Sequence, residues 1–446
     1  MRADFEGGRI SSDGGILILR QIELQHGWLE RLSAGFEDLR DPQRIEHTVA
    51  ELLRQRVFGL ALGYEDLADH EILRSDPALA VACEKTDPLG NDRRRPQDLG
   101  KPLAGKSTLH RLEVGLCGEK GRSPEKTLNF DAKYVEELLI DIWVENLDRQ
   151  TQKVVLDFDT TDHAIHGNQE GKFFHGYYDQ YCYLPLYVFC DGWPIVAWLR
   201  ESGIDPADGS VEVLEKIVKA VRKRFPAIEI TFRADSGFCR DSLMKWCEEN
   251  GVFYVIGIAR NSVLVRHIGG HLEEAKTRWE QAAGGKSVRV FHSFEYAAGS
   301  WANTRRVIAK AEWTSGEANP RFIVTNLGSE HGPSEHVYEQ VYCARGNMEN
   351  DIKQMLLDLN ADRNSSHWMR ANQIRLWLTT FAYIFMHKLR QDGLMSRVAI
   401  IAGSLFEIKC GAEGWIFEME AGVIIWRGRE RLGLGEGRCG GVREGW

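Results

Sequence analysis

The stretch "VVLDFDTTD", Val154–Asp162, places three carboxylates directly after an apolar run. The run "VVL" is typical of a buried strand. An unpaired buried carboxylate costs several kcal/mol or shifts its pKa until it is neutral. Two interpretations follow. The strand could end in a solvated acidic turn, which the isolated stretch favours, or its end could hold a positive group such as a metal ion.

Length and charge limit the class of protein. A chain of 446 residues is too long for one ordinary core, so two or three domains are expected. A net charge of -9 argues against a protein that coats nucleic acid non-specifically. Local basic clusters remain, and each alone is typical of a solvated face: "NDRRRP" (91–96), "VKAVRKRF" (218–225) and "NTRRVIAK" (303–310).

The sequence predicts a cytosolic protein. It has no apolar run of eighteen residues and no charged-then-apolar leader, so neither a membrane span nor a secretion signal is expected. Nine cysteines are scattered without a C-x-x-C pair, which indicates reduced thiols.

Residues 1–150 are predicted to be mostly helical. Apolar residues recur at helical spacing in "DPQRIEHTVAELLRQRVFGLALG" (41–63), "SDPALAVACEK" (75–85) and "STLHRLEVGL" (107–116). Short helices joined by loops fit a DNA-reading unit and a simple helical support equally well.

From Lys153 onwards the pattern predicts strands that alternate with helices. A strand, a hairpin that turns at "CDGW" (190–193), a helix, a strand, a helix and a strand follow one another up to residue 260. Antiparallel strands followed by crossover units predict an α/β fold with a mixed sheet and flanking helices. Residues 261–330 break the alternation and are predicted to form a β-rich insertion.

Two of the predicted strands end in aspartate. Asp159 ends the first strand, and Asp235 ends "ITFRAD" where that strand meets a helix. In α/β sheets, ligands collect outside the carboxyl ends of the strands. If the two strands are neighbours, both carboxylates face one cleft and suit a hard divalent cation.

A polar helix face supplies a third carboxylate. In "VYCARGNMENDIKQMLLDL" (341–359), four residues share one face of a helix: Tyr342, Arg345, Glu349 and Lys353. The carboxylates are predicted to hold a metal ion, and the cations and the tyrosine to hold phosphate oxygens. An ordinary solvated face remains the alternative.

Several segments together resemble the bacterial insertion-sequence transposases of the DDE class, and more narrowly the insertion sequence thirteen-eighty family. The resemblance extends over roughly residues 9–390 and includes "LDFDTTD", "HGNQEGKFFHGYYDQYCYLPLYVF", "RADSGF" and "YCARGNMENDIK". Further matches are "ISSDGGILILRQI", "STLHRLE" and "ADRNSSHWMRANQIRLWLTTFAYIFMHKLR". The resemblance implies a ribonuclease-H-like catalytic core.

The resemblance also implies which residues act. Asp159, Asp235 and Glu349 match the catalytic acids that hold Mg²⁺ (or Mn²⁺). Tyr342 and Arg345 match the family's Tyr-x-x-Arg-x-x-x-Glu signature. The signature's lysine position is Leu356 here, so Lys353, one turn earlier, is a departure from the pattern. Asp157 and Asp162 receive no role.

The implied function is DNA transposition. Such an enzyme cuts at the terminal inverted repeats of its element and transfers the freed 3′-OH to double-stranded target DNA. It acts as a homodimer in the synaptic complex, is associated with the nucleoid and does not involve a membrane. Two alternatives stay open: a DNA-binding relic without catalytic activity, and a paired-carboxylate glycoside hydrolase. The hydrolase would leave the cations beside Glu349 unexplained.

The predicted domain organisation follows from these assignments. Five segments are expected: a helical DNA-recognition domain (1–150), the first part of the ribonuclease-H-like domain (151–260), the insertion (261–330), the helical remainder of the catalytic domain (331–390) and an atypical tail (391–446). The last twenty residues contain seven glycines and five arginines and are predicted to be disordered. The aromatic stretch "KFFHGYYDQYCY" (172–183) could stack on an unpaired base, but core packing is the favoured interpretation.

Overall fold

The computed structural model describes residues 11–115, 128–282, 286–314 and 316–395, together with the short paired strands β15(Ile416–Phe417) and β16(Trp426–Arg427). The chain divides into two compact units. The sheet unit comprises Leu139–His166 and Gly171–Lys353, and the helical unit comprises the described residues of Met1–Leu138, Gly167–Glu170 and Gln354–Trp446. The predicted disordered tail lies outside the described residues, apart from Arg427.

The helical unit confirms the predicted helical character of the N-terminal region. Its elements are α1(Ile16–His26), α2(Trp28–Ser33), β1(Phe36–Asp38), η1(Pro42–Arg44), α3(Val49–Ala61), α4(His70–Leu73), α5(Pro77–Ala82), η2(Pro96–Asp98), α6(Lys106–Val114), β2(Leu128–Phe130), the first part of α7(Ala132–Asn146), and α14(Met369–Met395). Strands β1 and β2 pair antiparallel.

The helix predicted from Asp41 begins later than expected. Asp41 and Pro42 start only a single 3₁₀ turn. Helix α3 begins after Thr48, whose hydroxyl accepts a hydrogen bond from the backbone N–H of Glu51 at 3.2 Å. The Glu51 carboxylate accepts in return from the N–H of Thr48 at 2.8 Å. This capping box satisfies two backbone donors at once and therefore sets the start of the helix.

Helix α14 belongs to the helical unit and packs against α1, α3 and α6. The Phe385 ring meets Trp28 and Phe58 edge-on, at centroid distances of 5.3 and 5.6 Å. Of the segment 331–390, residues 331–353 lie in the sheet unit, whereas α14 lies in the helical unit. The chain leaves the sheet unit after Lys353 because the apolar side chains of α14 are buried among the N-terminal helices.

A buried charge network lies in this helical core. Glu113 is 1% exposed. Its carboxylate accepts from the guanidinium groups of Arg56 at 2.7 Å and Arg375 at 2.5 Å. Burial alone would raise the pKa of Glu113, but the two arginines outweigh burial and hold that pKa below its usual value. The contribution of this carboxylate to stability is therefore present above the unfolded-state pKa and is lost as the pH falls.

We predict that Glu113→Gln lowers the free energy of unfolding by about 3–5 kcal/mol, because it leaves two buried cations without a counter-charge. Urea denaturation followed by circular dichroism measures the loss. Glu137→Gln is the matched control, since Glu137 is an exposed partner of Lys133 on α7. Equal stability of the Glu113 and Glu137 variants at neutral pH would contradict the importance of the network.

The sheet unit alternates strands and helices as predicted. Its elements are β3(Lys153–Thr160), β4(His163–Ala164), β5(Phe173–His175), β6(Gln180–Tyr183), β7(Leu186–Cys190), β8(Trp193–Trp198), α8(Ser210–Arg224), β9(Glu229–Ala234), η4(Ser236–Phe238), α9(Asp241–Glu249), β10(Phe253–Ile258), α10(Ser262–His267), α11(Gly269–Gln281), β11(Val288–Tyr296), β12(Arg305–Thr314), β13(Glu317–Ala318), β14(Arg321–Thr325), η5(Ser329–His331), α12(Ser334–His336), η6(Val337–Tyr342), η7(Cys343–Arg345) and α13(Gly346–Leu357).

The central sheet is mixed, which confirms the α/β class. Its strand order is β11-β12-β14-β10-β9-β3-β7-β8, and β13 pairs with β12. The pairs β3–β9 and β9–β10 are parallel, whereas the other neighbours along this order are antiparallel. The predicted hairpin between β7 and β8 turns at Asp191 and Gly192, whose φ angles of 49° and 80° match a two-residue hairpin turn with both central residues left-handed.

The predicted β-rich insertion extends the central sheet. Strand β14 pairs with β10, β12 pairs with β14, and β11 pairs with β12, so these strands continue the sheet. Helices α10 and α11 precede these strands and were not predicted. The Gly269-Gly270 pair at the start of α11 disfavours a helix locally, and packing of α11 against β11 and β12 overrides that preference.

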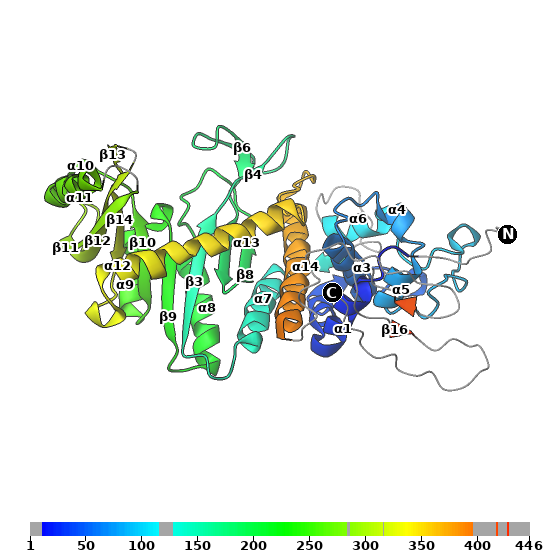
Figure 1. Cartoon of the computed structure of the whole chain (residues 1–446). Coiled ribbons are helices and arrows are strands. Elements are labelled where there is room, and N and C mark those ends of the chain that lie inside the picture. Colours follow the sequence, from blue (N-terminus) through cyan, green and yellow to red (C-terminus); the bar gives the residue numbers. More distant parts are fainter. Residues whose placement is uncertain are drawn as a thin grey trace, which may run out of the picture. The chain divides into compact units, whose positions relative to one another are not determined.

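A helical path from α12 to α13 crosses the strands of the sheet unit (yellow in Figure 1). It contains a π-helical segment, Val337–Tyr342, and then a 3₁₀ turn, Cys343–Arg345. Such irregular turns are frequent at functional sites. Among the described residues, no helix combines the length and the apolar character that crossing a bilayer requires.

Candidate active site

The two strand-end aspartates lie side by side. Strands β3 and β9 are parallel neighbours, and Phe158 is the partner of Ala234. Asp159 and Asp235 each follow this paired position. Adjacent strands are about 4.8 Å apart, and side chains two residues apart share a face. The condition that the sequence left open, namely that the two strands are neighbours, is therefore met.

Two residues earlier on the same face, Asp157 and Arg233 form a buried pair. The Arg233 guanidinium donates to the two carboxylate oxygens of Asp157 at 2.5 and 2.7 Å. It also donates to the backbone carbonyl of Val341 in the helical path. Asp157, to which the sequence assigned no role, thus neutralises an arginine that links two strands to this helix.

Arg345 connects Glu349 on the helix to Asp159 at the end of β3. Its guanidinium donates to Asp159 at 2.8 Å and to Glu349 at 2.5 Å. The side chains of Asp159 and Arg345 are 16% and 17% exposed, whereas that of Glu349 is 44% exposed. The structure therefore gathers Asp159, Asp235, Arg345 and Glu349 on one face of the sheet, from elements 186 residues apart in the sequence.

The electrostatics of Asp159 reflect this crowding. Burial raises the pKa of Asp159 to about 6. The Arg345 charge opposes the rise, whereas the charges of Asp235 and Glu349 add to it. A carboxylate that is buried among like charges is stabilised in its ionised form by a cation.

The remaining predicted phosphate-binding residues lie along the same helical path. Burial raises the pKa of Tyr342, and the nearby charge of Asp235 adds to the rise. The Tyr342 hydroxyl approaches the backbone of β10 so closely that a Cβ at Gly257 would meet it at 2.6 Å. Glycine at this position thus permits the tyrosine to lie beside Asp235. Lys353 is exposed one turn beyond Glu349.

Asp162 has a different partner. Its carboxylate accepts a hydrogen bond from Gln180 of β6. It therefore supports the small sheet that contains β6.

The donor set fits the chemistry of a hard divalent cation. Three carboxylates and one guanidinium carry a formal charge of -2, and oxygen ligands are what Mg²⁺ and Mn²⁺ prefer. In the described part of the chain, no three His, Cys, Asp or Glu side chains already stand at metal-binding spacing. Arg345 lies between Asp159 and Glu349, so coordination by both acids requires this guanidinium to move.

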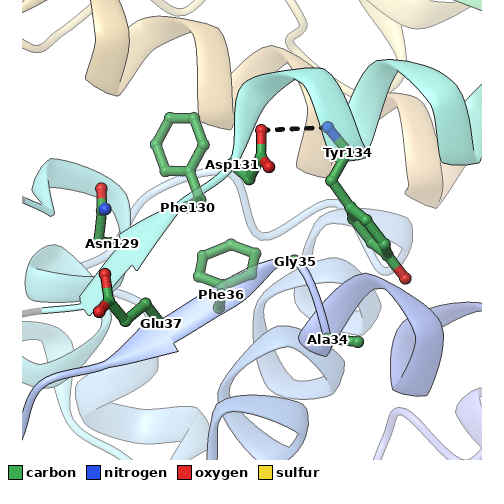
Figure 2. A pocket seen from close by; sticks show the side chains of 8 residues that line it. All are labelled: Ala34, Gly35, Phe36, Glu37, Asn129, Phe130, Asp131 and Tyr134. Carbon is green, nitrogen blue, oxygen red and sulfur yellow. Dashed lines mark hydrogen bonds between the residues drawn. The ribbon is translucent and has the colours of Figure 1, made fainter.

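A pocket of about 440 Å³ lies elsewhere, within the helical unit. Residues around β1 and β2 line it, including Phe36, Phe130 and Tyr134 (Figure 2). Asp131 accepts a hydrogen bond there from the backbone N–H of Tyr134 at 3.2 Å. None of the predicted site residues lines this pocket.

The basic clusters noted in the sequence are largely engaged in internal contacts. Arg305 is 4% exposed and pairs with Asp241 and Glu248. Arg93 pairs with Glu46 in the helical unit. These arginines stabilise the fold and are not displayed to a partner.

The comparisons with known proteins identify the class. The model of the family "Transposase DDE domain group 1" matches residues 1–402. The chain is therefore a DDE transposase, a protein of DNA transposition. It belongs to the family Transposase DDE domain group 1, and transposases of this class use divalent metal ions.

Other comparisons add little. No curated protein sequence matches the chain. The chain is similar to a piggyBac transposase, whose structure was determined by cryo-EM as a synaptic complex with hairpin DNA, at 13% identity and a TM-score of 0.36. The match covers 72% of this chain and 77% of that one. At this TM-score the similarity supports no conclusion about the site.

We predict that Arg233 positions the site as well as stabilising the fold. Asp157→Asn should lower the free energy of unfolding by about 3–5 kcal/mol, because it leaves a buried cation unpaired. The double variant Asp157→Leu/Arg233→Met should regain most of that loss, because replacing both partners by apolar groups is often neutral. Its DNA cleavage should nevertheless stay impaired, because Val341 has lost its donor.

Urea denaturation and a cleavage assay on the same preparations separate the two effects. A double variant that is as stable and as active as the wild type would show that Arg233 has no positioning role.

Proposed function

We propose that the chain is an insertion-sequence transposase of the insertion sequence thirteen-eighty type. It cuts DNA at the terminal inverted repeats of its element and transfers the 3′-OH to target DNA. The observation that carries this proposal is the meeting of Asp159, Asp235 and Glu349 around Arg345 on one face of a mixed sheet.

Asp159, Asp235 and Glu349 are the residues that would hold Mg²⁺ (or Mn²⁺). When bound, a pair of such ions lowers the pKa of an attacking water and stabilises the leaving oxygen. The two aspartates are held by strand ends that pair in register, so they form the rigid part of the site. Glu349 is more exposed and is held by Arg345, so it is the adjustable part.

Arg345 has two roles in this proposal. Without a metal ion it neutralises Asp159 and Glu349. A divalent cation held by the acids would supply that neutralisation, and the guanidinium would then be available to bind a phosphate, whose geometry it matches with two parallel hydrogen bonds. Tyr342 and Lys353 would hold further phosphate oxygens from the same helical path.

The helical unit is proposed to recognise the element ends. Helix α6 buries Leu109 and Leu112 and exposes Lys106, Ser107 and Arg111 on its other side. A short helix with a basic exposed face is suited to contacts with DNA phosphates and base edges. Arg305 and Arg306, from the basic cluster at 303–310, bond instead to Glu248 and to Leu327 within the sheet unit.

Two further parts of the proposal concern assembly and location. Joining two element ends requires two active sites, so the protein would act as a homodimer on double-stranded DNA in the synaptic complex. The same DNA partners would associate it with the nucleoid in the bacterial cytoplasm.

We predict that Glu349→Gln abolishes Mg²⁺-dependent strand cleavage and leaves binding to the element ends within about twofold. The change keeps the shape of the side chain but removes one negative ligand. Cleavage is measured on labelled DNA that carries the element ends, with binding followed by gel shift. Glu335→Gln, at an exposed position on α12, is the matched control and should cleave normally.

The central assignment fails if the Glu349 variant cuts DNA at the wild-type rate. It also fails if wild-type cleavage persists undiminished after removal of divalent cations with a chelator.

We predict that Arg111→Gln weakens binding to the element ends and reduces the slope of log K against log salt by about one, because one phosphate contact is lost. Fluorescence anisotropy across a range of salt concentrations measures both effects. Lys133→Gln, an exposed position on α7, is the control. An unchanged salt slope in the Arg111 variant would exclude α6 from the DNA interface.

A further inference from the structure

A small sheet beside the active site displays aromatic side chains. Strands β4, β6 and β5 form a three-stranded antiparallel sheet, which follows directly on the strand that carries Asp159. Phe173 is 52% exposed, Phe174 46%, Tyr177 85% and Tyr181 47%. Among the described residues, these are all of the large aromatic side chains that are classed as exposed. The core packing that the sequence favoured for this stretch is therefore wrong for these four residues.

We define an aromatic platform as Phe174 and Tyr181, which share one face of this sheet, together with the exposed Tyr177 in the connection between β5 and β6. Phe174 and Tyr181 are direct cross-strand partners, so their side chains lie on the same face. Their rings meet edge-on at 5.4 Å, and the two side chains remain 46% and 47% exposed. Lys172 lies over the Tyr181 ring at 4.9 Å and adds a positive charge to this face.

The platform lies near the proposed catalytic acids. Tyr178 touches Tyr177, with ring centroids 5.0 Å apart. Burial raises the pKa of Tyr178, and the charges of Asp162 and Asp159 add to the rise. The segment that carries the platform is therefore within electrostatic reach of Asp159.

The chemistry of this region favours a neutral aromatic ligand. The Asp162 carboxylate, whose charge acts on Tyr178, disfavours a phosphate group at this position. A DNA base is uncharged and presents a flat face that stacks on aromatic rings. The Lys172 ammonium, which lies over the Tyr181 ring, can bind a backbone phosphate of the DNA strand that carries this base.

We propose that an unpaired base of the DNA strand stacks on the aromatic platform beside the cleavage site. This inference rests on the proposed function, because it assumes that DNA reaches Asp159. A base that stacks on the platform is outside the duplex. The DNA strand beside the acids would therefore stay unpaired and would be held in place while the scissile phosphate is presented.

The test is binding of a labelled single-stranded oligothymidylate by the full chain, compared with a duplex of the same length. Phe174→Ala and Tyr181→Ala should each weaken single-strand binding on the order of 10-fold, which is typical of a lost base–aromatic contact. Duplex binding should stay unchanged. Phe174→Tyr and Tyr181→Phe keep the stacking surface and should bind as the wild type does.

Further controls separate the platform from general effects. Ile72→Ala removes an exposed apolar side chain that is 81% exposed and lies in the helical unit, and it should not alter single-strand binding. An oligonucleotide of the same length with abasic sites should bind the wild type as weakly as the intact strand binds the alanine variants.

The inference is overturned if the alanine variants bind the single strand as tightly as the wild type does. It is also overturned if light scattering shows that a wild-type dimer becomes a monomer in these variants with single-strand affinity unaltered, which would make a second copy the occupant. Failure of the proposed function would give a different result. The Glu349→Gln variant would then still cleave DNA, whatever the affinity of the platform variants for single-stranded DNA.

Discussion

The arrangement of the site depends on one guanidinium, that of Arg233. It lies on β9, pairs with Asp157 on β3 and donates to Val341 in the helical path. These three elements carry Asp235, Asp159 and Glu349, respectively. Arg233 is only 7% exposed, so water stabilises its charge little. The Asp157 carboxylate supplies the counter-charge. A single buried pair thus holds the carriers of all three proposed catalytic acids in contact.

The second constraint is electrostatic. Two like charges about 4 Å apart repel by about 4 kcal/mol at an effective dielectric constant of 20. Arg345 pairs with both Asp159 and Glu349, and its positive charge offsets the repulsion between them. A divalent cation would compete with Arg345 for these two acids. Arg345 thus lies between two of the three acids, and in the described part of the chain these acids do not already stand at metal-binding spacing.

Local patterns predicted the components of the site but not the contacts between them. The ends of β3 and β9 could be predicted because extended runs finish in aspartate, and the contact of Arg345 with Glu349 follows from helical spacing. The pairing of Asp157 with Arg233 could not, because it depends on strand register over 76 residues. The placement of α14 could not be predicted for a similar reason, since a helix does not encode its packing partner in its own sequence. Exposure of the aromatic platform could not be predicted either, because an aromatic strand has the same sequence pattern whether its side chains face a core or solvent.

The most direct test of the central claim is the position of Mn²⁺ in the full chain bound to DNA, located by its anomalous X-ray scattering. The account predicts manganese between Asp159 and Asp235, with the Glu349 carboxylate turned toward it and the Arg345 guanidinium moved onto a phosphate. Manganese bound elsewhere, or Glu349 still paired with Arg345 and pointing away from the metal in a DNA-bound complex, would contradict it.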